Sequence, residues 1–135
     1  AGAAHVVIDD GRIEGKVRAI APGGVDAALE LVGIPVLGDT LRCVRPGGMV
    51  SFTGSLTEVW SMKDFSPFGL IPSTVGLTVY HGHAWDLPAS VLQEVLDAVK
   101  AGEMSVPIAG VFHGLEQVRA MESHEVPGKN VVVLG

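Results

Sequence analysis

Two histidines, His81 and His83, and a single cysteine, Cys43, are the side chains best suited to metal binding or nucleophilic attack. Residues two apart on a strand point to the same face, so the two imidazoles could share an ion. No third ligand follows at a suitable spacing, so we expect no zinc site. Cys43 falls in a predicted helix beside apolar residues, which favours a buried thiol over a nucleophile.

Neither a hydrolase nor a phosphate-binding loop is indicated by the short motifs. Ser51 lies in the middle of a predicted strand, and Gly54-Ser55 lacks the pattern of a nucleophile elbow. The sequence contains no G-x-G-x-x-G motif. Gly23-Gly24 and Gly47-Gly48 each precede a predicted strand, and we interpret both pairs as helix stops.

The residues that follow two predicted strands are better candidates for a binding site. In an open parallel sheet, ligands lie beyond the carboxyl ends of the strands. Glycine at such a position lets a ligand approach the backbone closely, although Gly33 and Gly54 would serve equally well to end their strands. The candidates that follow these strands are Val32, Gly33, Thr53, Gly54, Ser55 and Leu56.

The elements that must position these residues alternate between strand and helix. Apolar runs and alternation predict strands at 5–9, 25–32, 49–53, 75–81, 108–113 and 130–134. Apolar residues three and four apart predict helices at 12–20, 34–44, 88–102 and 115–123. This order predicts an α/β, Rossmann-like fold, a mostly parallel sheet flanked by helices. The irregular stretch 55–73, with Trp60 and Phe65, is the segment expected to line or cover a site.

Length and composition narrow the function classes. The 135 residues suit one domain, and 47% hydrophobic residues argue against disorder. A net charge of -6 argues against nucleic acid as a partner. Apolar runs are too short for a membrane span, and no signal peptide is expected at the amino end. With one cysteine suited to a reducing compartment, we expect a cytoplasmic protein.

Several segments in order resemble the medium-chain dehydrogenase/reductase superfamily, which includes zinc-type alcohol dehydrogenases and quinone oxidoreductases. The most informative are residues 25–33, VDAALELVG, and residues 41–54, LRCVRPGGMVSFTG. Residues 2–9, the helix at 88–102, the strand ending Val111-Phe112-His113 and the tail GKNVVVL at 128–134 continue the match. The similarity covers nearly the whole chain and corresponds to the C-terminal part of the cofactor-binding domain plus the C-terminal tail.

The resemblance implies hydride transfer between NAD(P)H and a carbonyl, quinone or activated alkene. In this family a catalytic domain and a strand, Gly-rich turn and helix that hold the cofactor pyrophosphate come first, and this sequence has no counterpart of them. It therefore implies a single partial cofactor domain over 1–135, incomplete at its N-terminal side, with 104–135 as candidates for the catalytic domain of full-length relatives. The family's zinc ligands and the residue that selects NAD or NADP fall in the absent part.

The implied site is the nicotinamide half only, with weak or absent cofactor binding and little or no activity in the isolated chain. The resemblance implies no catalytic side chain. It implies main-chain contacts to nicotinamide and ribose, with the segment from Tyr80 to Gly82 nearby. Lys129 is a candidate for a contact with a cofactor phosphate, although an exposed lysine is also the ordinary expectation before a final strand. The full candidate set is Val32, Gly33, Thr53, Gly54, Ser55, Leu56, Tyr80 and Lys129.

The resemblance also implies a homodimer through the strand Val75 to His81, whose composition leaves it undefended against edge pairing. Two alternatives remain open: a methyltransferase-like domain, suggested by Arg45-Pro46-Gly47-Gly48, and a non-catalytic dimerisation or regulatory remnant. In the family's strand order, two strands that this sequence does not contain lie between those matching 5–9 and 25–32, so we expect the tail 130–134, or 5–9 itself, to pair with 25–32. Domain swapping with a second copy is the alternative.

Overall fold

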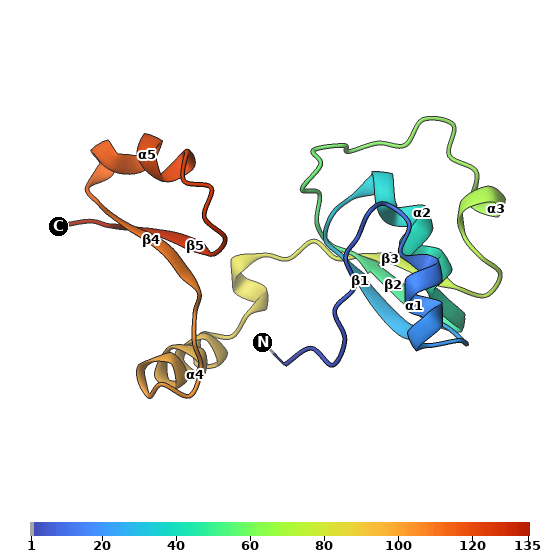
Figure 1. The fold of residues 1–135 in the computed structure, drawn as a ribbon, viewed down its shortest axis with the longest axis horizontal. Helices are drawn as coiled ribbons and strands as arrows, with labels where there is room; N and C mark the ends of the chain where they lie inside the picture. The colour runs from blue at the N-terminus through green and yellow to red at the C-terminus, as the bar shows by residue number, and fades with distance from the viewer. Residues whose placement is uncertain (1) are drawn as a thin grey trace. The chain divides into compact units, whose positions relative to one another are not determined.

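The computed structural model describes residues 2–135, whose backbone forms two compact units divided after Gly82 (Figure 1). Each unit contains a parallel sheet with helices beside it, so the predicted Rossmann-like α/β class is confirmed. No helix within residues 2–135 is long and apolar enough to cross a membrane.

The first unit is a three-stranded parallel sheet in the order β1-β2-β3. Its elements are α1 (Glu14–Ile20), β1 (Val25–Glu30), α2 (Ile34–Cys43), β2 (Val44–Phe52), α3 (Pro67–Leu70) and β3 (Gly76–Val79). Helix α2 packs on β1 and β2, and α1 lies against α2. With one helix between β1 and β2, the connection has the βαβ form that joins parallel strands.

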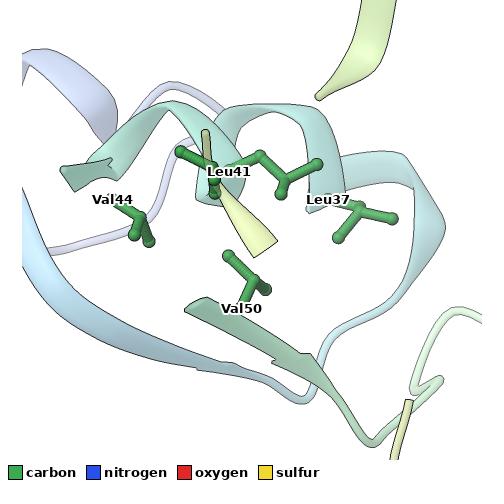
Figure 2. Packing of buried hydrophobic residues seen from close by; sticks show 5 residues of the cluster. Leu37, Leu41, Val44 and Val50 are labelled. Carbon is green, nitrogen blue, oxygen red and sulfur yellow. The ribbon is translucent and has the colours of Figure 1, made fainter. Parts of the chain in front are cut away.

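The core of the first unit lies between α2 and the sheet. Leu37 and Leu41 project from α2 toward Val50 of β2, and Val44 and Val75 complete the buried cluster (Figure 2). Leu41 and Val50 are fully inaccessible to solvent. The spacing of four between the two leucines, which predicts a shared helix face, is confirmed by this packing.

Strand β2 begins earlier than the sequence predicts. The expected strand 49–53 is the end of a longer strand, Val44–Phe52, that also contains Pro46. Its pairing with β1 shifts register between Val25 and Ala27. Proline cannot donate a ladder hydrogen bond and is confined to edges and irregular positions, so the shift is where β2 accommodates it.

The second unit contains a pair of parallel strands, with one helix before the pair and another between the two strands. Its elements are the 3₁₀ turn η1 (Ala84–Asp86), α4 (Ala89–Lys100), β4 (Ile108–His113), the 3₁₀ turn η2 (Leu115–Gln117), α5 (Val118–Glu122) and β5 (Lys129–Val133). Strands β4 and β5 pair directly with each other. The predicted helix 115–123 is thus divided into a 3₁₀ turn and a short α-helix.

The strand predicted at 5–9 is wrong. This segment is not in a strand, and one of its backbone carbonyls is bound by a side chain. The ammonium of Lys16 donates to the carbonyl of Ile8 at 2.9 Å and to the carboxylate of Asp10 at 2.7 Å. A β-branched run becomes a strand only where a neighbour supplies ladder hydrogen bonds.

The prediction that the tail 130–134, or the segment 5–9, pairs with 25–32 is also wrong. The tail 130–134 does not pair with 25–32, because β5 pairs with β4 in parallel, from Ile108 opposite Lys129 to His113 opposite Val133. The backbone groups of the tail are satisfied by the neighbour that precedes it in sequence, across the short connection that contains η2 and α5.

Candidate functional site

A pocket of about 300 Å³ lies where β2 and β3 end. It is lined by Phe52, Thr53, Gly54, Ser55, Trp60, Val79, Tyr80 and His81. The two strands run parallel in register, with Phe52 opposite Val79, so their carboxyl ends deliver these residues to the same edge of the sheet. Four predicted site residues therefore come together here: Thr53, Gly54, Ser55 and Tyr80.

The other edge of the site is the turn between β1 and α2. The backbone N–H of Thr57 donates to the carbonyl of Val32 at 3.2 Å, so the turn lies against the segment that leaves the pocket. Gly33 has φ of +129°, and a Cβ there would lie 2.7 Å from the Thr57 hydroxyl oxygen. Backbone conformation and close packing therefore account for glycine at this position.

Gly54 is required by a close passage of two strand ends. A Cβ on Gly54 would lie 2.4 Å from the carbonyl oxygen of Leu31, closer than any real contact. Its own N–H donates to the carbonyl of Glu30 at 3.2 Å. The end of β2 is thereby held tightly against the end of β1, which fixes the wall of the pocket.

Glu30 anchors both edges of the site, and the sequence analysis missed it. Only 4% of this residue is exposed. Its carboxylate accepts hydrogen bonds from the backbone N–H of Val32 at 2.7 Å and of Gly33 at 3.0 Å, and from the hydroxyl of Thr40. The available signal was an acidic residue between two leucines at the end of a predicted strand, because such a group is buried only when it is paired.

The backbone of Glu30 does the same for the second strand end. Its carbonyl accepts from the N–H of Thr53 at 2.9 Å as well as from that of Gly54. The amide donors of Val32, Gly33, Thr53 and Gly54 are thus all used inside the protein. The main chain at these four positions can offer a ligand only carbonyl acceptors.

Trp60 enters the pocket from the irregular segment after β2, as expected of a stretch predicted to line or cover a site. A turn places it there: Glu58 N–H donates to the Ser55 carbonyl at 3.2 Å, and the Ser55 hydroxyl donates to the Val59 carbonyl at 3.4 Å. Trp60 is 80% exposed, so it lines the pocket from its solvent-exposed rim.

Tyr80 closes the pocket on the β3 side. Its N–H donates to the Phe52 carbonyl at 3.0 Å, continuing the β2–β3 ladder by one residue. A Cβ on Gly82 would lie 2.8 Å from Cε1 of the Tyr80 ring, so the ring folds back over this glycine. An aromatic ring held over the backbone is a rigid, partly apolar surface against which a planar ligand can lie.

Four of the eight predicted site residues do not line the pocket: Val32 and Gly33, in the neighbouring β1–α2 turn, and Leu56 and Lys129. Leu56 follows the lining residues but is 81% exposed and does not line the pocket. Lys129 belongs to the second unit, where it is the first residue of β5 and its N–H donates to the Pro107 carbonyl at 2.7 Å.

The sequence profile of the family described as zinc-binding dehydrogenase matches residues 1–132. The chain belongs to this family. The predicted membership of the medium-chain dehydrogenase/reductase superfamily is confirmed. A search of curated protein sequences gives no match.

Solved structures of the superfamily share the fold. AibC is 26% identical with a TM-score of 0.78, over 99% of this chain and 37% of AibC. A quinone oxidoreductase from Pseudomonas syringae pv. Tomato DC3000 is 16% identical with a TM-score of 0.66, over 90% and 39%. Mycobacterial Rv1454c in complex with NADPH is 19% identical with a TM-score of 0.61, over 90% and 38%. The chain therefore spans less than half the length of these structures.

The family is described as zinc-binding, so the side chains of this chain are compared with the requirements of a zinc site. Within residues 2–135, no group of three or more His, Cys, Asp or Glu side chains is placed to hold a metal ion. His81 lines the pocket, whereas the His83 ring stacks on Trp85 with 4.5 Å between centroids. Cys43 is buried, as predicted, and burial together with the nearby Asp39 carboxylate raises the pKa of its thiol to about 11.

Proposed function

We propose that this chain forms the nicotinamide half of the NAD(P) site of an oxidoreductase. Its reaction would be hydride transfer between NAD(P)H and a carbonyl, quinone or activated alkene. Membership of the zinc-binding dehydrogenase family supports this reaction class over the methyltransferase-like alternative. The nicotinamide ring carries the hydride when the cofactor is bound, and the protein supplies orientation.

The observation that carries the proposal is the pocket at the joined carboxyl ends of β2 and β3. Ligands of open α/β sheets bind at such an edge. Its volume of about 300 Å³ is at the lower end of ligand pockets, which suits one ring and its sugar rather than a whole dinucleotide. Trp60 and Tyr80 supply aromatic surface for a planar ring, and the closely packed Gly54 keeps the floor free of side chain.

Weak binding of the whole dinucleotide follows from the chemistry of the β1–α2 turn. A strand, turn and helix bind phosphate through free backbone N–H groups at the start of the helix. In this turn the N–H groups of Val32 and Gly33 already donate to the Glu30 carboxylate. A pyrophosphate placed here would lose those donors and meet a negative charge. We keep Leu56 as a proposed cofactor contact and Lys129 as a proposed phosphate contact. Neither residue lines the pocket.

We also propose that the protein is a homodimer and that it acts in the cytoplasm, a reducing compartment. Strand β3 pairs with β2 on one side only, at the edge of its sheet. Val79 and Tyr80 are half exposed at the end of this edge, where a second copy would add a strand. The buried, protonated thiol of Cys43 is consistent with a compartment where cysteines stay reduced.

Binding is tested with Trp85→Phe, which leaves Trp60 as the only tryptophan. We expect reduced nicotinamide mononucleotide to quench Trp60 fluorescence by energy transfer to its ring. NADPH and NADH should bind no more than slightly tighter than the mononucleotide, because the phosphate end finds no donors. S-adenosylmethionine should not bind.

A matched pair of variants locates the binding site. Thr53→Tyr places a large ring in the pocket and should abolish quenching, whereas Thr78→Tyr lies on β3 outside the pocket and should leave it unchanged. If no nicotinamide nucleotide binds, or if S-adenosylmethionine binds better, the proposed function is wrong. Low-micromolar binding of NADPH would contradict the half-site.

A further inference from the structure

One residue, Glu30, takes up four backbone N–H groups beside the candidate site, two through its carboxylate and two through its backbone carbonyl. The side chain of Glu30 takes up two amide donors of the β1–α2 turn, and its carbonyl takes up those of Thr53 and Gly54. The main chain at these strand ends therefore offers a ligand carbonyl acceptors, which bind ligand N–H and O–H groups. Donors in the pocket come from side chains, such as the Thr53 hydroxyl and the Tyr80 phenol.

The negative charge of the Glu30 side chain also favours ligand donors over anionic groups. Because only 4% of the residue is exposed, water and salt screen the charge of this carboxylate much less than that of a surface acid. Its three donors, two amides and the Thr40 hydroxyl, are neutral, so they satisfy its hydrogen bonding without cancelling its charge. An anionic group brought to the strand ends would therefore be repelled.

We infer that Glu30 is a positioning and specificity-determining residue, which makes the site select a neutral, hydrogen-bond-donating carboxamide and reject a carboxylate in its place. This inference rests on the proposed function, because it concerns the group that the nicotinamide ring presents to the pocket. Glu30 acts through the backbone of the strand ends and through its charge, and does not itself contact the ligand.

The discriminating ligands are nicotinamide mononucleotide and nicotinic acid mononucleotide. They differ only in carboxamide against carboxylate, so the contribution of the common phosphate cancels in the ratio of their dissociation constants. For the unaltered chain we expect the amide to bind at least about tenfold more tightly, measured by NMR titration. The ratio is informative because a general loosening of the fold would weaken both ligands together.

Glu30→Gln removes the charge while keeping the hydrogen bonds. The Gln carbonyl can accept from Val32 and Gly33, and its NH₂ can donate to the Thr40 oxygen, whose own hydroxyl also lies 3.3 Å from the Val36 carbonyl. The matched control is Asp26→Asn, which removes an equal charge at the opposite end of β1, where the side chain is 86% exposed. We expect the ratio to fall severalfold in Glu30→Gln and to stay unchanged in Asp26→Asn.

Each result has a separate meaning. If both mononucleotides bind the unaltered chain equally, the inference is overturned and the proposed function stands, a result that does not depend on any variant folding. An unchanged ratio in a folded Glu30→Gln protein also overturns it. If neither mononucleotide binds, the proposed function falls and the inference falls with it.

Discussion

The carboxylate of Asp39, in α2, accepts a hydrogen bond from the backbone N–H of Ile13 at 2.6 Å, joining residues 26 positions apart. The same oxygen accepts from the N–H of Glu14 at 3.2 Å. These N–H groups begin α1, a helix of seven residues that buries none of them fully. So short a helix is marginal alone, and a cap supplied by its neighbour holds it in place.

Asp39→Ala should therefore destabilise the first unit by about 1 kcal/mol, the usual cost of losing a helix cap. Chemical unfolding followed by circular dichroism measures this. Asp39→Asn keeps an oxygen acceptor and should lose clearly less. Equal stability of the Ala variant and the parent would mean that α1 is held by other contacts.

Leu41→Ala should cost about 2–5 kcal/mol, because it leaves a cavity at the centre of the core between α2 and the sheet. Leu41 is fully buried, whereas Leu56 is 81% exposed. Leu56→Ala is the same chemical change on the surface and should shift stability by no more than about 0.5 kcal/mol. Thermal unfolding of the two variants compares them directly, and similar losses would contradict the packing in Figure 2.

Regular spacing is what made the core predictable. The interval of four between Leu37 and Leu41 indicates a helix face without knowledge of its partner, and the structure buries both. The run at 5–9 looks equally convincing as a strand, but a strand exists only through hydrogen bonds to a neighbour, which sequence pattern alone does not identify. The tail 130–134 was predicted as a strand correctly and given the wrong partner for the same reason.

The residues at the strand ends of the site were predictable from the sequence, whereas the buried Glu30 that holds them was not. Thr53, Gly54 and Ser55 come together with Tyr80 because parallel strands end at one edge, a property of topology. Glu30 was missed because its role depends on turn geometry that brings amides from two chain segments around one residue.

Thr40→Val should destabilise the protein by about 1–3 kcal/mol, because the buried Glu30 carboxylate loses a hydrogen-bond donor and gains no replacement. Thr40→Ser retains the hydroxyl and should recover most of the loss. Denaturant unfolding of both variants provides the comparison. A loss in Thr40→Val no larger than that in Thr40→Ser would mean that the hydroxyl contributes no more than the methyl group.

Stability should fall as pH rises from about 9 to about 11, owing to Cys43. Burial raises the pKa of its thiol from 9.0 to about 11, so in this interval the unfolded chain releases a proton that the folded chain keeps. Protonation therefore stabilises the fold below pH 9, and the contribution is lost as pH rises through the folded pKa. Urea unfolding at a series of pH values should show a smaller decline in Cys43→Ala.

Val79→Pro should convert the proposed dimer to a monomer without unfolding the sheet. The N–H of Tyr80 bonds the Phe52 carbonyl on the β2 side. Since N–H groups alternate in direction along a strand, that of Val79 points to the free edge of β3, where a second copy would accept it. Proline removes this donor and spares the ladder to β2. Sedimentation velocity should show a dimer for the parent and a monomer for the variant.

Val79→Thr keeps the N–H and the β-branched shape, and should remain dimeric. A parent chain that sediments as a monomer at high concentration would refute association through β3.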